Sequence, residues 1–222
     1  MSIEGNVKDI QRRIAAACER AGRSTDDVEL VAVTKTIDTP AIEEAFHAGV
    51  RHFGENRVQE AAPKIERLAT IRPELTWHMV GHLQTNKAKT AADIFDIIQS
   101  VDSLRLAEAL SGRSQRRLPV LIEVNVGGEE SKSGLTPFGL EEAVERIARL
   151  PNLRVDGLMT IAPWVEDAEE VRPVFRHLRQ IRDTLGLRHL SMGMSGDFEV
   201  AIEEGATMVR IGRAIFGERR RA

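Results

Sequence analysis

Short apolar runs alternate with amphipathic stretches along nearly the whole chain. The runs have the length and the β-branched content of buried strands. The stretches between them carry apolar residues at spacings of three and four, as amphipathic helices do. The sequence predicts strands at 29–34, 52–55, 76–81, 94–99, 119–126, 155–161, 189–194 and 208–211.

Helices are predicted between these strands and before the first one. The N-terminal helix has its apolar positions at Ile3, Val7, Ile10 and Ile14, and Gly22 closes it. The later helices are predicted at 39–47, 57–68, 85–92, 104–110, 136–150, 167–185 and 198–203.

Alternation of strands and helices at this spacing predicts right-handed βαβ units and a parallel sheet. Eight such units predict an α/β fold, a closed (β/α)8 TIM barrel with an extra N-terminal helix. An open doubly wound sheet is the alternative. No linker or shift in composition interrupts the pattern, so we expect residues 1–222 to form a single domain.

Composition and charge narrow the expected partners. A formal net charge of -3 with 42% hydrophobic residues is ordinary for a soluble globular protein, so nucleic acid is not an expected partner. No apolar run approaches the ~20 residues that span a bilayer, and the N-terminus lacks the features of a signal peptide, so no membrane partner is expected. The lone cysteine, Cys18, fits a reducing compartment. We expect a cytoplasmic monomer.

A lysine directly follows the first predicted strand. The run at 31–34 is apolar enough for a buried parallel strand, and Lys35 follows it directly. An amine at the mouth of a sheet or barrel loses solvation, which lowers its pKa and lets it attack an aldehyde to form a Schiff base. A surface lysine just beyond a strand gives the same pattern, so other residues must decide between the two interpretations.

The last two predicted strands end in residues that suit a phosphate group, at the place where many barrels bind one. Ser195 leads into a helix start, although a simple serine N-cap gives the same pattern. Arg210 lies inside an apolar strand and needs a carboxylate or a ligand as partner, and Gly212 lets the backbone approach a phosphate. Together with Lys35, these loops predict a site for a phosphorylated aldehyde. Pyridoxal 5'-phosphate (PLP) is the common cofactor of that kind.

A series of short motifs extends this pattern in order along nearly the whole chain. They are AVTKT at 32–36, FGEN at 53–56 with VQE at 58–60, WH at 77–78 with Gly81, LQTNK at 83–87, SKSG at 131–134, GLM at 157–159, SMGMS at 191–195 and MVRIG at 208–212. With these motifs the chain resembles the pyridoxal phosphate homeostasis protein family, which is similar to the N-terminal barrel of alanine racemases.

The resemblance implies that Lys35 forms an internal aldimine with PLP and that Arg210 faces the pyridine nitrogen. It also implies that Ser195, Gly212 and the backbone amide of Arg213 hold the phosphate. The implied role is that of a PLP carrier or regulator, with PLP-dependent apo-enzymes as candidate partners. The cofactor-binding residues expected from the resemblance are Lys35, Asn56, Lys132, Met194, Ser195, Arg210, Gly212 and Arg213.

Three positions depart from the pattern of the resembled family. A small hydroxyl residue is usual at the position of Arg213, so a hydroxyl bond to phosphate is lost, whereas the backbone amide is retained. A second lysine is common at the position of Ile37, and its role in cofactor transfer is not carried over. A tyrosine often stands at the position of Arg57.

The chain contains no tyrosine. The resembled racemases need a tyrosine from a second domain as the acid/base opposite their lysine, so a racemase-type reaction is not expected here. His78 or His82 could in principle replace it. Three interpretations therefore stay open: a PLP carrier or regulator without racemase-type catalysis, a PLP-dependent racemase or decarboxylase, and a Schiff-base aldolase or phosphate-binding barrel without PLP. The resemblance favours the first.

Overall fold

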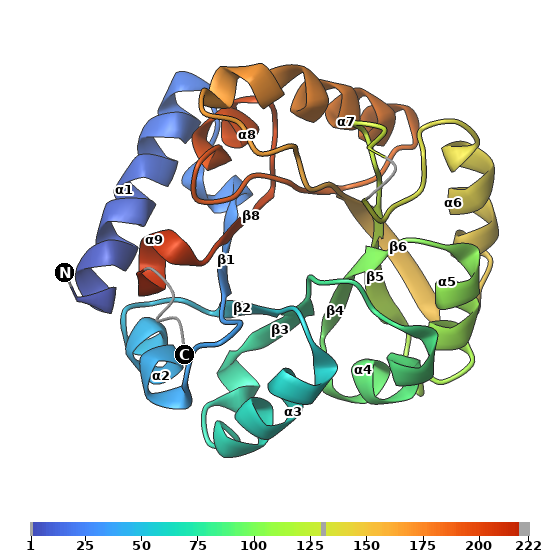
Figure 1. The fold of residues 1–222 in the computed structure, drawn as a ribbon, viewed down its shortest axis with the longest axis horizontal. Helices are drawn as coiled ribbons and strands as arrows, with labels where there is room; N and C mark the ends of the chain where they lie inside the picture. The colour runs from blue at the N-terminus through green and yellow to red at the C-terminus, as the bar shows by residue number, and fades with distance from the viewer. Residues whose placement is uncertain (1, 130–131, 218–222) are drawn as a thin grey trace.

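The computed structural model describes residues 2–129 and 132–217; Ser131 of the SKSG motif lies outside them. Within the described residues, eight parallel strands form a closed barrel in the order β1 to β8, and helices form a ring around it (Figure 1). The prediction of a (β/α)8 barrel is confirmed. The pairing of β1 with β8, which joins Val31 to Arg210 in register, excludes the open sheet.

The bounds of the elements follow the predicted alternation. The strands are β1 (Glu29–Val33), β2 (His52–Glu55), β3 (Thr76–Met79), β4 (Ile97–Val101), β5 (Leu118–Glu123), β6 (Leu153–Met159), β7 (His189–Ser191) and β8 (Met208–Ile211). The helices are α1 (Ile3–Arg20), α2 (Thr39–His47), α3 (Val58–Arg67), α4 (Ala88–Ile94), α5 (Leu104–Ser111), α6 (Leu140–Ala148), α7 (Arg172–Thr184), α8 (Phe198–Glu203) and α9 (Arg213–Phe216).

Several boundaries differ from the predicted ones. Strand β4 begins at Ile97 and not at 94, because α4 continues through the apolar Ile94. Helix α6 begins at Leu140 and not at 136, because Gly139 at its N-cap has a φ of 75°, which breaks the helix before it. The short helix α9, directly after β8, was not predicted, since four residues are too few to show a helical period.

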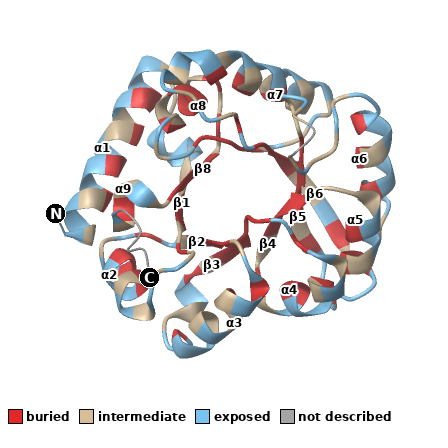
Figure 2. Cartoon of the chain, viewed as in Figure 1, coloured by how far each residue is buried: buried red, intermediate tan, exposed pale blue. Residues whose placement is uncertain are grey.

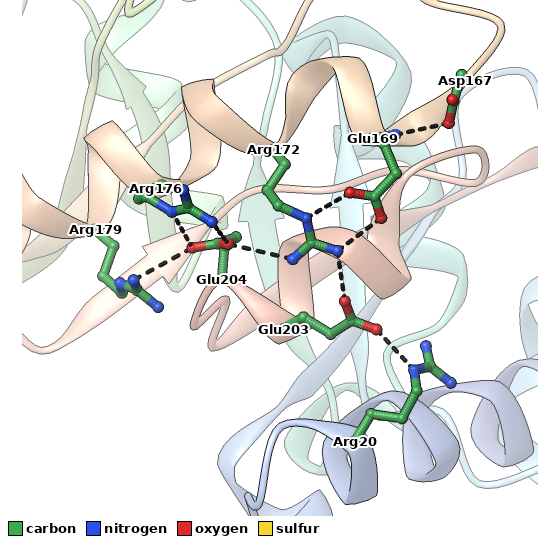
Figure 3. Close-up of polar contacts among 8 residues, drawn as sticks. All are labelled: Arg20, Asp167, Glu169, Arg172, Arg176, Arg179, Glu203 and Glu204. Atoms are coloured by element: carbon green, nitrogen blue, oxygen red, sulfur yellow. Dashed lines mark hydrogen bonds and ion pairs between the residues drawn. The ribbon is translucent and has the colours of Figure 1, made fainter.

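The predicted extra helix α1 is present and lies against α2, α8 and α9 on the outside of the barrel (Figure 1). Its buried face includes Val7, Ile10 and Ile14, as the apolar spacing predicts. Ion pairs also tie it to the rest of the fold, because Glu203 of α8 pairs with both Arg20 of α1 and Arg172 of α7 (Figure 3).

Most strand residues are buried, and the ring of helices surrounds the strands (Figure 2). The interior contains an apolar cluster from four strands, formed by Val31, Leu121, Met159 and Met208. Polar side chains share this interior with it, which is unusual for a barrel core. No helix among residues 2–129 and 132–217 is long and apolar enough to cross a membrane.

Candidate cofactor site

A cavity of about 770 Å³ opens at the end of the barrel where the strands terminate. The segments that follow β1, β6, β7 and β8 supply most of its lining. Of the eight residues expected to bind the cofactor, seven line this cavity: Lys35, Lys132, Met194, Ser195, Arg210, Gly212 and Arg213. Residues from opposite ends of the sequence therefore meet at one site, because β1 and β8 are neighbours.

Lys35 is half-buried and occupies the second position of a tight turn. Its N-terminal neighbour, Thr34, is fixed at three points. The Thr34 amide donates to the Gly54 oxygen at 2.9 Å, its hydroxyl donates to Glu55 Oε1 at 2.6 Å, and its backbone oxygen accepts a 2.7 Å bond from Lys64 Nζ. The same oxygen accepts from the amide nitrogen of Ile37 at 3.0 Å, which closes the turn.

Thr36 completes this turn with a φ of 64°, in the left-handed region that a β-branched residue rarely adopts. Its hydroxyl donates to the backbone oxygen of Lys35 at 2.6 Å. Lys35 therefore lies between an anchored residue and a strained one, so the backbone that carries its amine is well defined.

Arg210 is buried beneath the cavity and lines it. Its Nη1 donates to Ser191 Oγ at 2.6 Å, and its Nη2 donates to the backbone oxygen of Thr160 at 2.8 Å. Burial lowers the pKa of Arg210 to about 10, although the carboxylates of Asp197 and Glu123 oppose this shift. The guanidinium is therefore a cation at neutral pH. Its hydrogen-bond partners among the described residues are a hydroxyl and a carbonyl and not a carboxylate, one of the two partners expected, and the other, a ligand, stays a prediction.

The loops after β7 and β8 meet beside the cavity, and both contribute to its lining. Ser195 Oγ accepts a 3.4 Å bond from the backbone N–H of Ala214, which joins the two loops. At Gly212 a Cβ atom would lie 3.2 Å from the backbone oxygen of Val33, so a side chain here would crowd β1. Arg213 follows at the exposed edge. These loops present a hydroxyl and a guanidinium to the cavity, a combination suited to an anion.

The remaining expected residues differ in their positions. Lys132 Nζ pairs with Glu129 Oε1 at 2.6 Å on the rim, and Met194 is 38% exposed there. Asn56 is half-buried and is not among the described residues that line the cavity. It lies against Gly81, where a Cβ atom would come within 2.7 Å of the Asn56 Cα.

Neither histidine weighed as a substitute for tyrosine lines the cavity within the described part of the chain. His78 is fully buried inside the barrel, and burial lowers its pKa to about 3. His82 is exposed, and its Nδ1 lies 2.9 Å from Asp102 Oδ2 and 3.4 Å from Ser133 Oγ. A serine triad uses both ring nitrogens, whereas here both contacts fall on one, so this cluster is not a nucleophile relay.

Sequence reasoning missed the residues that support Lys35 and Arg210. Ser191 belongs to the SMGMS motif at 191–195, and its hydroxyl is buried and accepts a hydrogen bond from Arg210. Lys64 resembles a solvated helix residue in the sequence, yet it pairs with the buried Glu55 at 2.7 Å. The sequence did contain one signal for this ion pair. Glu55 ends a predicted strand, and a carboxylate buried there needs a cationic partner.

Known proteins are similar to this chain in sequence and in fold. The family model described as alanine racemase, N-terminal domain, matches residues 6–220. A pyridoxal phosphate homeostasis protein of Aquifex aeolicus is 49% identical over 220 residues, which cover 95% of this chain and 96% of the relative. The chain belongs to the pyridoxal phosphate homeostasis protein family. The resemblance carried by the motifs at 32–36, 191–195 and 208–212 is thereby confirmed.

Solved structures agree with this family. PipY of Synechococcus elongatus, solved with PLP bound, is 39% identical and has a TM-score of 0.81, covering 94% of this chain and 100% of PipY. An alanine racemase from Corynebacterium glutamicum has a TM-score of 0.68 at 20% identity and covers 96% of this chain and 62% of its own. The racemase shares the fold.

Proposed function

We propose that this protein binds PLP in the cavity and serves PLP homeostasis as a carrier or regulator. The observation that carries the proposal is the convergence of Lys35, Arg210, Ser195 and Gly212 on one cavity at the ends of β1, β7 and β8. The donor set fits the cofactor, since it offers an amine for an aldehyde, a cation for a ring nitrogen and an anion site for a phosphate. The relative PipY, with PLP bound, supports the same assignment.

Each residue has a separate task in this proposal. Lys35 holds the cofactor covalently through its Nζ, and Arg210 contacts the pyridine nitrogen. Ser195 and the backbone at Gly212 and Arg213 hold the phosphate. Lys132, Met194 and, at a greater distance, Asn56 border the site. PLP supplies a reactive aldehyde and a conjugated ring.

The proposed role is binding and not catalysis. The chain has no tyrosine to act as the second acid/base. Arg210, cationic at neutral pH, would disfavour protonation of a pyridine nitrogen placed against it and so make the ring a weaker electron sink. We further propose that the protein acts as a monomer, as a single domain of residues 1–222, in a reducing cytoplasm where Cys18 stays a buried thiol. Apo-enzymes that require PLP are its proposed partners.

Addition of PLP to the purified protein tests the covalent site. A visible absorption band should develop, borohydride should fix the cofactor, and peptide mass spectrometry should find the label on Lys35. Lys35→Ala should lose both signals, whereas Lys89→Ala, at an exposed lysine of α4, should keep them. Label on another lysine, or an unchanged band in Lys35→Ala, would contradict the proposal.

Two measurements test the carrier role. Transfer of PLP from the loaded protein to an apo-enzyme should differ in rate from transfer of free PLP at equal concentration. Exchange of the α-proton of amino acids in deuterated water should be no faster than with free PLP. Exchange well above that rate would favour a PLP-dependent enzyme instead.

A further inference from the structure

A hydrogen-bonded chain of side chains crosses the barrel interior, beginning at Arg210. Arg210 Nη1 donates to Ser191 Oγ at 2.6 Å, and Ser191 Oγ donates to Gln99 Oε1 at 2.6 Å. Gln99 Nε2 lies 2.8 Å from His78 Nδ1, and His78 Nε2 lies 3.0 Å from His52 Nδ1. The chain thus connects β8, β7, β4, β3 and β2, and its members other than His52 are buried.

Arg210, the first residue of the chain of hydrogen bonds, determines which atom donates in each later bond. A guanidinium can only donate, so Ser191 accepts from Arg210 and must give its single proton to Gln99. The Gln99 oxygen is thereby committed to Ser191, and its amide nitrogen faces His78 Nδ1. His78 therefore carries its proton on Nε2, which donates to His52. A neutral ring is required for this arrangement, and burial keeps His78 neutral across the physiological range.

The chain also fixes the plane of the guanidinium. The bonds to Ser191 and to the Thr160 oxygen use two different nitrogens of Arg210, so rotation about the end of the side chain would break one of them. Thr160 is itself held, because its hydroxyl donates to the Val124 oxygen at 2.7 Å. A guanidinium has five N–H groups, so donors remain for the cavity that Arg210 lines.

Stability alone does not account for a polar chain at this place. Barrel interiors are normally filled by branched apolar side chains, and well-packed apolar replacements of buried polar networks are often neutral or stabilising. The apolar cluster of Val31, Leu121, Met159 and Met208 shows that this interior accepts such packing. Gln99 Nε2 even lies 3.5 Å from the sulfur of Met208, at the edge of that cluster.

We propose that Ser191, Gln99 and His78 are positioning residues that hold the Arg210 guanidinium in one orientation, with its remaining N–H groups directed at the ring nitrogen of PLP. This inference rests on the proposed function, since it assigns a task toward the cofactor to residues that do not line its cavity.

Ser191→Ala, compared with Ser100→Ala, tests the positioning role. Ser100 is a matched control, because it is an equally buried serine whose hydroxyl has no hydrogen-bond partner among the described residues. Nitrogen-15 NMR of the protein without PLP reports rotation of the Arg210 guanidinium. Ser191→Ala should release that rotation, raise the dissociation constant of PLP about tenfold and shift its absorption band. Ser100→Ala should leave all three unchanged.

Gln99→Leu provides a second test one bond further from the guanidinium, and it applies even where Ser191→Ala does not fold. Like Ser191→Ala, this substitution should increase rotation of the Arg210 guanidinium and weaken PLP binding. If either variant folds and keeps both the wild-type rotation and the wild-type dissociation constant, the positioning role is wrong. If the wild-type protein takes up no PLP, the proposed function itself is wrong, so the two failures are distinguished by the wild-type protein.

Discussion

Lys64 donates a 2.7 Å hydrogen bond to the backbone oxygen of Thr34, one residue before the proposed cofactor lysine. The same ammonium pairs at 2.7 Å with Glu55, whose side chain is fully buried, and burial raises the pKa of that carboxyl. A buried ion pair thus fixes the end of β1 and the start of the turn that carries Lys35.

Removing Lys64 should therefore affect both stability and cofactor capture. Lys64→Met leaves Glu55 buried without its cation, which should lower the free energy of unfolding by about 3 kcal/mol in urea denaturation. Covalent capture of PLP by Lys35 should slow, because Thr34 loses one anchor. Lys89→Met, at an exposed lysine, is the control. Adding Glu55→Gln to Lys64→Met should recover most of the stability, and a double variant no more stable than Lys64→Met would contradict the ion-pair explanation.

Glu123 should make stability depend on pH. Burial, reinforced by the Asp102 carboxylate, raises the pKa of Glu123 to about 7 from an ordinary 4.5. Between these two values the folded state keeps a proton that the unfolded chain has lost. The contribution of Glu123 to the free energy of unfolding is therefore fully present below pH 4.5 and is lost as pH rises through about 7. The loss amounts to about 3 kcal/mol by pH 8.

Urea denaturation at several pH values compares Glu123→Gln with the wild-type protein. The variant should gain stability relative to wild type as pH rises from 5 to 8 (roughly the interval over which the group titrates). Glu141→Gln, at an exposed glutamate of α6, should follow the wild-type curve. Parallel curves for Glu123→Gln and the wild-type protein would show that Glu123 titrates normally.

Thr36 should tolerate replacement by a residue that prefers the left-handed region. Its φ of 64° is strained for a β-branched side chain, whereas asparagine adopts this conformation readily. Thr36→Asn should stabilise the protein without PLP by about 1 kcal/mol, and Thr36→Val, which keeps the branching and loses the hydroxyl bond to Lys35, should destabilise it. Thermal unfolding measures both. Equal effects of the two substitutions would argue against strain at this position.

The ion pairs around Glu204 should contribute more to stability than exposed pairs do. Its carboxylate is 5% exposed and pairs with Arg172, Arg176 and Arg179 (Figure 3). Glu204→Gln leaves these cations without their shared partner and should cost about 2 kcal/mol, with a smaller effect in high salt. Glu145→Gln breaks the exposed pair with Arg149 and should cost less than about 0.5 kcal/mol. Equal costs would mean that the network acts as ordinary surface charge.

The barrel and the outline of the site could be predicted from sequence because both follow from local patterns. Each βα unit shows its own periodicity, and Lys35 and Gly212 could be placed because chemistry in such barrels gathers at strand ends. The partner of Arg210 could not be placed this way. Ser191 lies on the neighbouring strand β7 and Gln99 lies across the barrel on β4, and their meeting depends on register and side-chain packing that no local pattern encodes.

Closure of the barrel has a consequence for biosynthesis. Lys35 leaves the ribosome with the first strand, whereas Arg210 and Gly212 leave it with the last, and the two ends become neighbours when β8 pairs with β1. A nascent chain therefore displays its amine long before it has the cation and the phosphate loop that would retain a ligand. If the proposed site is right, retention of the cofactor requires β8, and a fragment that stops before β8 should be unable to sequester PLP.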